Sequence, residues 1–418
     1  MPSANAMRRN FLWNTFGNIV YMGCQFLCGI LVVRLAGEVN SGNYNVALAV
    51  TNIFVSVASY GMYSFQVSDV ENQYSQSTYI ASRMSTCVLA TVLCMGYTLL
   101  GATIGENPYS RLQYACILLY QAYRMVESIT DVYNAIDQKS NRLDIVGKTY
   151  AIRGVASLAV FVAVLWITHD MVLTLLFMLA ANVMLFFFYT LPKARPFYVR
   201  TPVAESAVLA LLWECLPLAI YNVLANTAAS IPKLMLEKLM GEAALGIYSP
   251  VTQPVLLLQV GATYLFTPFI TLFAQNYAQR NRKGFYKAIA AVQGIVLALL
   301  PAGLLVCRFL GRWGLAVFVG AGLESYDYLL APMVVSAVLT AMMLFYSMVL
   351  TVMRCMRGLI FANVCGIVTA ALISSPCIRQ WELQGTTIAT IGALCVQCVC
   401  LVIITLVNAR RHFNGQDL

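Results

Sequence analysis

The chain contains twelve apolar stretches, each about long enough to cross a bilayer, separated by short polar segments. A helix needs about 20 residues to cross a hydrocarbon core about 30 Å thick. The stretches cover roughly residues 11–36, 44–66, 82–104, 110–135, 148–167, 170–191, 208–228, 243–273, 286–307, 326–348, 356–376 and 384–408. With 60% hydrophobic and 10% charged residues, the chain lies outside the usual range of water-soluble domains. We therefore predict an all-α integral membrane protein.

A ten-residue pattern occurs in both halves of the chain. Residues 35–44 and 239–248 share Leu, Gly, Glu, Gly and Tyr at an offset of 204 residues, and a cation precedes each copy. The positions are Arg34, Gly37, Glu38, Gly42 and Tyr44 in the first copy and Lys238, Gly241, Glu242, Gly246 and Tyr248 in the second. The repeat predicts two homologous halves, residues 1–200 and 201–418, each with six spans. Internal repeats in a very apolar chain are typical of transporters.

Lys and Arg are distributed unevenly between the loops. With the N-terminus in the cytoplasm, 18 of the 26 cations fall on inner segments, Arg83 and Arg153 among them, and seven on outer segments. Arg124 lies within a span. Because cytoplasmic loops are enriched in Lys and Arg, this pattern predicts that both termini are cytoplasmic. The same bias explains the net charge of +9 without a nucleic acid partner.

The sequence argues against metal and nucleotide chemistry. The only histidines are His169 and His412, and the 13 cysteines are not spaced as a zinc site. Gly147-Lys148-Thr149 looks like the end of a phosphate loop, but Arg142 stands where that motif requires its first glycine. We expect no metal, no cofactor, no catalytic residues and no enzymatic activity.

Polar residues within the spans are the best pointers to a functional site, because a bilayer disfavours them. The fourth span carries Gln121, Arg124, Glu127 and Asp131 on one helical face. One interpretation is an intrahelical ion pair between Arg124 and Glu127 with no further role. The other is that Arg124 binds an anionic head group. Glu127 and Asp131, with Glu214 in the seventh span, are then candidates for coupling to H⁺ or Na⁺.

The opening helices of both halves carry amides and tyrosines. The first span has Asn14, Asn18, Tyr21 and Gln25, and the seventh has Tyr221, Asn222 and Asn226. The offset of 204 residues pairs Asn18 with Asn222. Such amides can join neighbouring helices. They can equally line a cavity for hydroxyl-rich sugars, which need many neutral donors and acceptors.

These features resemble the polysaccharide-transporter branch of the multidrug/oligosaccharidyl-lipid/polysaccharide (MOP) exporter superfamily. The resemblance rests on the twelve spans, the repeated Leu-x-Gly-Glu-x-x-x-Gly-x-Tyr pattern, Gln138-Lys139-Ser140-Asn141-Arg142, and Gly-Leu-Glu-Ser-Tyr at 322–326. It implies two six-helix bundles related by a pseudo-two-fold axis, in a MATE-like V shape. It further implies that a polyprenyl-diphosphate-linked oligosaccharide is flipped from the inner to the outer leaflet of a bacterial plasma membrane, alongside a polysaccharide polymerase and glycosyltransferases.

In such a protein the repeated motif forms a helix–turn–helix at the outer gate. Its glycines permit the turn, and Glu38 and Glu242 cap the helices that follow. Two other functions remain open. A cation-coupled exporter of drugs or metabolites on the same fold would depend on Glu127, Asp131 or Glu214. A membrane enzyme, such as a polysaccharide polymerase, would need a large outer loop that this sequence does not contain.

Overall fold

The computed structural model describes residues 4–69, 72–103, 109–253, 273, 275–277, 279–318, 323–353 and 355–414. Within these ranges the chain is almost entirely helical. It divides into two compact units, Met1–Asn226 and Thr227–Leu418, called unit 1 and unit 2 below. Eight helices in the described ranges are long and apolar enough to cross a membrane.

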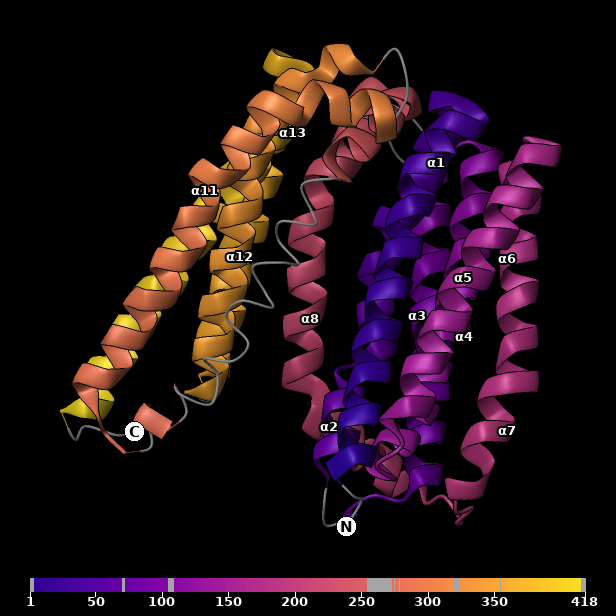
Figure 1. The fold of residues 1–418 in the computed structure, drawn as a ribbon, viewed down its shortest axis with the longest axis vertical. Coiled ribbons are helices and arrows are strands. Elements are labelled where there is room, and N and C mark those ends of the chain that lie inside the picture. Colours follow the sequence, from indigo (N-terminus) through magenta and orange to yellow (C-terminus); the bar gives the residue numbers. More distant parts are fainter. Residues whose placement is uncertain are drawn as a thin grey trace. The chain divides into compact units, whose positions relative to one another are not determined.

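Unit 1 is a bundle of long helices that lie side by side in Figure 1. They are α1 (Ala4–Ser59), α3 (Gln76–Thr103), α4 (Arg111–Lys139), α5 (Leu143–Thr168) and α6 (Met171–Leu185). Shorter elements are α2 (Met62–Ser68), the π-helical turn η1 (Phe186–Thr190), α7 (Leu191–Ala194) and the 3₁₀ turn η2 (Arg195–Phe197). Helix α1 packs against α3, α4 and α5 and therefore lies at the centre of the bundle.

Helix α1 contains the first predicted span and most of the second. The two spans meet at Gly37, whose backbone angles are φ 78° and ψ 178°. Only glycine adopts this region without strain. The second predicted span, 44–66, is interrupted within its length. Tyr60 and Gly61 both have positive φ, so α1 ends at Ser59 and α2 continues from Met62.

Small residues allow α1 and α5 to approach closely. A Cβ atom at Gly17 would lie 1.9 Å from the Gly147 carbonyl oxygen. A Cβ at Gly154 would lie 2.8 Å from the Cα of Tyr21. Close backbone contact at small residues is the usual basis of helix association in membranes. In this protein, close contact at these glycines determines which face of α5 packs against α1.

Helix α8 (Glu205–Met240) crosses the boundary between the units. The boundary follows Asn226, whereas the repeat predicts one at 200/201. The difference arises because Leu211 and Cys215 of α8 belong to a buried core of unit 1. That core also contains Met62, Tyr74, Tyr79 and Val132. The first helix of the second sequence repeat therefore begins within unit 1.

Unit 2 contains α11 (Arg282–Phe318), the 3₁₀ turn η3 (Glu324–Leu329), α12 (Leu330–Val352) and α13 (Met356–Phe413). Helix α12 packs between α11 and α13. Helix α13 contains the last two predicted spans, with a break at Glu382 (φ 49°, ψ −124°). The eighth predicted span, 243–273, lies mostly outside the described residues, which include only 243–253 and 273 of it.

Large apolar side chains cover the outside of both units. Phe188 is 81% exposed, Phe309 79% and Ile167 78%. Contiguous exposed apolar surface on this scale is unfavourable in water and normal against hydrocarbon. Helix α4 differs from its neighbours because its interior carries several charges.

Candidate functional site: a buried charge cluster in unit 1

Three helices of unit 1 bring charged and aromatic side chains together inside the bundle. Helix α1 contributes Tyr21, α4 contributes Arg124 and Glu127, and α5 contributes Tyr150 and Arg153. We call these five residues the buried charge cluster. The side chains of Glu127 and Arg153 are 5% and 4% exposed, whereas that of Arg124 is 23% exposed. Among the three charged members, Arg124 is thus the most exposed.

The carboxylate of Glu127 is the centre of this cluster. Its Oε2 pairs with Nη1 of Arg124, and its Oε1 lies 3.4 Å from Nε of Arg153. The Tyr21 hydroxyl donates a hydrogen bond of 2.6 Å to the same Oε1. The Arg153 guanidinium lies 5.2 Å from the ring centre of Tyr21 and 5.5 Å from that of Tyr150. One carboxylate is therefore the shared counter-ion of two arginines, and aromatic faces add cation–π stabilisation.

The cluster has spare hydrogen-bond donors. Within the described residues, Nε and Nη1 of Arg153 and Nε of Arg124 form no hydrogen bond. Arg83 of α3, which is also buried, donates to the Ala58 carbonyl at 2.7 Å and to Ser128 Oγ at 3.4 Å. Its Nε forms no hydrogen bond within the described residues. Buried donors normally have partners. Unused guanidinium N–H groups are suited to the oxygens of an anion such as phosphate.

Two further predicted residues lie beside the cluster. Gln25 donates from Nε2 to the Tyr123 hydroxyl at 3.3 Å. Asp131 accepts a hydrogen bond of 3.3 Å from the Tyr150 hydroxyl. The predicted pair between Arg124 and Glu127 is present, but Arg153 from another helix shares the carboxylate. The interpretation as a purely intrahelical pair is therefore incomplete.

Other predicted polar residues are engaged elsewhere. Asn18 donates from Nδ2 to the Asn14 carbonyl at 2.9 Å, within α1. Gln121 is fully buried, and its Nε2 lies 3.6 Å from Met125 Sδ. Glu214 is exposed and accepts a 2.9 Å hydrogen bond from the Tyr74 hydroxyl.

The amides of α8 also make helix contacts. Asn226 donates from Nδ2 to Ser56 Oγ at 2.9 Å and to the Asn222 carbonyl at 3.0 Å. Tyr221 and Asn222 are half-buried. The contact between Asn226 and Ser56 joins α8 to α1. It agrees with the interpretation that these amides link neighbouring helices.

The two copies of the repeated motif share a backbone feature and differ in their side-chain contacts. Gly37 and Gly241 both have positive φ, 78° and 85°. Tyr44 is fully buried between the rings of Tyr120 and Phe161, with centroids 5.6 and 5.4 Å away. In unit 2, the Tyr248 hydroxyl lies 3.2 Å from Thr387 Oγ1.

The remaining motif residues lie around these turns. Arg34 and Glu38 are exposed, Lys238 and Glu242 are half-buried, and Gly42 and Gly246 are buried. The predicted capping is not seen, because neither glutamate side chain forms a hydrogen bond within the described residues.

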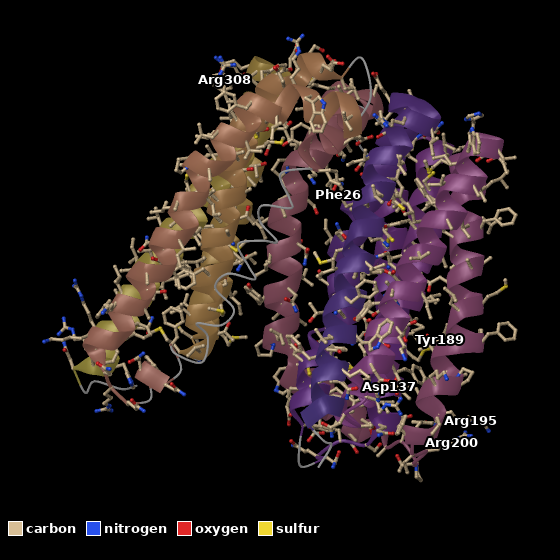
Figure 2. All side chains as sticks on the ribbon, in the orientation of Figure 1. Phe26, Asp137, Tyr189, Arg195, Arg200 and Arg308 are labelled. Carbon is tan, nitrogen blue, oxygen red and sulfur yellow. The ribbon has the colours of Figure 1, made fainter. Side chains whose placement is uncertain are left out.

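Residues 138–142 tie several elements together where α4 ends, close to Asp137 in Figure 2. Gln138 Oε1 accepts from the Tyr63 hydroxyl at 2.5 Å, and Lys139 Nζ donates to the Asp69 carbonyl at 2.6 Å. The Asn141 carbonyl accepts from Asn10 Nδ2 at 2.6 Å. Arg142 forms a two-bond ion pair with Asp144 at 2.8 and 3.1 Å. This segment joins α1, α2, α4 and α5.

Sequence reasoning missed two members of this region. Arg83 and Arg153 are counted above with the inner loop cations, and this is wrong because both lie within helices, 1% and 4% exposed. For Arg153 a signal was present, since it stands five residues inside the apolar stretch 148–167. An arginine at that depth belongs with the intramembrane charges.

Comparison with known proteins places this chain in a family. The model of the family described as polysaccharide biosynthesis protein matches residues 7–277. The chain belongs to this family. The capsular polysaccharide biosynthesis protein CapF of Staphylococcus aureus is similar to this polysaccharide biosynthesis protein, with 24% identity over 319 residues that cover 75% of this chain and 78% of CapF.

Solved structures with a similar fold are transporters. An inward-facing multidrug resistance MATE family transporter of the MOP superfamily matches with a TM-score of 0.73 and 12% identity, covering 98% and 100% of the two chains. The lipid II flippase MurJ in an inward closed conformation matches with a TM-score of 0.72 and 11% identity, covering 97% and 90%. The predicted fold class is confirmed. The chain therefore belongs to a polysaccharide biosynthesis family and has the multi-pass membrane fold of these transporters.

Proposed function

We propose that the protein flips polyprenyl-diphosphate-linked oligosaccharides from the inner to the outer leaflet of a bacterial plasma membrane, for cell-surface polysaccharide synthesis. The family supports the biosynthetic role. The observation that carries the proposal is the buried charge cluster, in which Arg124 and Arg153 share the Glu127 carboxylate and keep unused N–H donors. Charged groups inside a membrane are rare and generally functional.

In this proposal Arg124 and Arg153 bind the diphosphate. Glu127 is their counter-ion when no cargo is bound, and the cargo competes with it for the same guanidinium groups. Coupling to H⁺ or Na⁺ at Glu127, Asp131 or Glu214 would let the gradient drive this exchange. The neutral groups of the predicted cavity residues that are not fully buried supply donors and acceptors for sugars. They are Asn14, Asn18, Tyr21, Gln25, Tyr221, Asn222 and Asn226. Partners in the pathway would be a polysaccharide polymerase and glycosyltransferases.

The proposed orientation has both termini in the cytoplasm. After Arg83 and Arg153 are removed from the loop cations, 16 remain on inner segments against seven on outer segments. This difference still supports the orientation. The motif turns at Gly37 and Gly241 would then lie on the outer side, as parts of an outer gate.

The test is translocation of a fluorescent polyprenyl-diphosphate oligosaccharide in proteoliposomes, measured with a membrane-impermeant quencher. The proteins compared are wild type, Arg124→Ala, Arg153→Ala and the matched control Arg111→Ala, an exposed arginine at the start of α4. A hydrogen bond to a charged group contributes about 1.5–3 kcal/mol. Since about 1.4 kcal/mol corresponds to tenfold in affinity, we expect each cluster variant to lose roughly tenfold or more in initial rate at subsaturating cargo, and Arg111→Ala to remain unchanged.

Thermal unfolding of each variant in detergent separates loss of the site from loss of the fold. Absence of flipping by well-folded wild type with several different glycans would contradict the proposal. The alternative, a cation-coupled exporter of drugs or metabolites, would then predict efflux that depends on Glu127, Asp131 or Glu214.

A further inference from the structure

A groove of about 750 Å³ lies on unit 2 between α11 and the segment η3–α12. Its floor is apolar and includes Leu304, Leu305 and Ala331, and its rim carries Arg308, Arg312 and Asp327. The two helices touch beside the groove at Gly311, where an added Cβ would lie 2.8 Å from Leu330 Cδ1. The floor is therefore held by helix packing.

The rim lies at the level of lipid head groups. Between Lys287 and Arg308, helix α11 has an uncharged run of 20 residues, which spans about 30 Å, the thickness of the hydrocarbon core. Arg308, labelled in Figure 2, lies at the end of unit 2 opposite the C-terminus, which Figure 1 marks in the same orientation. Leu305, one turn below it, is 58% exposed, and Phe309 is 79% exposed. The groove thus opens toward lipid in one leaflet, which is the outer leaflet in the proposed orientation.

The charges on the rim are separated into two parts. Arg308 and Arg312 stand one turn apart on α11, whereas Glu324 and Asp327 lie on η3. Arg312 approaches Glu324 only to 3.9 Å, and the two side chains are 74% and 38% exposed, so this pair contributes little. Within the described ranges, Arg308 and the Asp327 carboxylate form no ion pair.

Arg308 and Arg312 lie on the proposed outer side, whereas most Lys and Arg residues of the chain lie on the inner side. The enrichment of cytoplasmic loops in Lys and Arg therefore does not explain these two arginines. Their number equals that of the acids on η3, Glu324 and Asp327. A ligand with several negative charges, such as a diphosphate, would be repelled by Glu324 and Asp327. The complement of the rim is a head group with one phosphate and one ammonium.

We propose that this groove binds one aminophospholipid of the phosphatidylethanolamine class. Arg308 and Arg312 hold its phosphate, Asp327 accepts hydrogen bonds from its ammonium, and its acyl chains cover Leu304, Leu305 and Ala331. The site does not depend on which cargo the transporter carries, because none of the buried charge cluster takes part.

The test is native mass spectrometry of the protein released from nanodiscs that contain equal amounts of phosphatidylethanolamine and phosphatidylglycerol with identical acyl chains. We expect wild type to retain one phosphatidylethanolamine, and Arg308→Ala/Arg312→Ala to retain roughly tenfold less, as loss of charge-assisted hydrogen bonds predicts. Asp327→Asn should remove the preference over phosphatidylglycerol. The matched control is Arg379→Ala, an exposed arginine of α13 that does not line the groove, which should bind as wild type does.

Phosphatidylcholine in place of phosphatidylethanolamine tests the ammonium directly, because its methylated nitrogen has no N–H donor. Weaker retention of phosphatidylcholine supports the proposal. Equal retention of all three lipids by wild type, or equal loss in Arg379→Ala, would mean general boundary lipid and overturn it. Displacement of the bound lipid by polyprenyl diphosphate would also overturn it, in favour of a cargo site.

Discussion

Gly37 and Gly241 show how single residues define the two turns of the repeat. A Cβ at either position would meet no atom within 4 Å, so the requirement for glycine comes from the positive φ alone. This conformation is strained for any residue with a side chain.

We predict that Gly37→Ala and Gly241→Ala each destabilise the protein by about 1–3 kcal/mol. Thermal unfolding in detergent measures the change. The control is Gly23→Ala in α1, which also has open space around its Cβ but no positive φ, and should leave stability unchanged or raise it. An unchanged unfolding temperature in both turn variants would mean that the turns can adopt another conformation.

Asp69 shows how a residue outside the spans responds to its surroundings. Partial burial raises the pKa of its carboxyl. Hydrogen bonds from the backbone N–H groups of Gln73 and Tyr74 and from the Tyr79 hydroxyl, with Lys139 nearby, outweigh this and hold the pKa below its usual value. The ionised form is therefore favoured in the folded protein.

A lowered carboxyl pKa stabilises the fold above the unfolded pKa of about 4, and this stabilisation is lost as the pH falls through the lower folded value. We predict that Asp69→Asn destabilises the protein at neutral pH and flattens the pH dependence of its stability below pH about 5. Unfolding temperatures of both proteins between acidic and neutral pH provide the measurement. Parallel curves for the two proteins would show that Asp69 is not the group responsible.

At the scale of elements, the packing of α5 on α1 assembles the buried charge cluster. Gly147 and Gly154 remove side chains from the face of α5 that meets α1, and Arg153 is carried on the same stretch of helix. The position of Arg153 beside Tyr21 and Glu127 therefore follows from helix contact at glycines.

We predict that Gly147→Ala disrupts both stability and function, because the new Cβ would lie 2.1 Å from the Trp13 carbonyl oxygen. Overpacking of this kind is destabilising by typically about 1–3 kcal/mol. The control is Gly96→Ala in α3, where no atom lies within 4 Å of the added Cβ. Lowered unfolding temperature and flipping rate in the first variant only would agree with the prediction. Equal behaviour of both variants would show that α1 and α5 tolerate separation.

At the scale of the whole molecule, the chain has about twelve predicted spans, and its two halves share a repeat but differ in their charged residues. Unit 1 contains two buried arginines, Arg83 and Arg153, and the half-buried Arg124, whereas the arginines of unit 2 that the structure describes are exposed. Burial of a charge is expensive unless partners compensate for it. The asymmetry places the candidate site for an anionic group in the first half of the chain.

The proposed orientation predicts the labelling of two sites at opposite ends of one span, Met171–Phe197. In a background without the 13 native cysteines, Thr168→Cys should react with an impermeant maleimide in intact cells. Arg195→Cys should react only after permeabilisation, because the cation-rich loops face the cytoplasm. Both residues are exposed, so access is not limiting. The reverse pattern would invert the topology and place the aminophospholipid groove in the inner leaflet.

The sequence by itself determined the membrane environment, the fold class, the positions of most helices and the glycine turns. These depend on local properties, namely the hydrophobicity of about 20 consecutive residues and the backbone freedom of single glycines. It also placed Arg124 and Glu127 on one face of α4, since helical periodicity is local as well.

Only the tertiary structure decided that Arg153 and Tyr21 meet Glu127, that Asn14 and Gln121 make other contacts, and that the boundary between the units falls after Asn226. These outcomes depend on which helix faces come together. The faces of α1 and α5 that meet are set by close approach at Gly17, Gly147 and Gly154, although the two helices are more than a hundred residues apart in sequence. A hydropathy pattern does not predict such contacts.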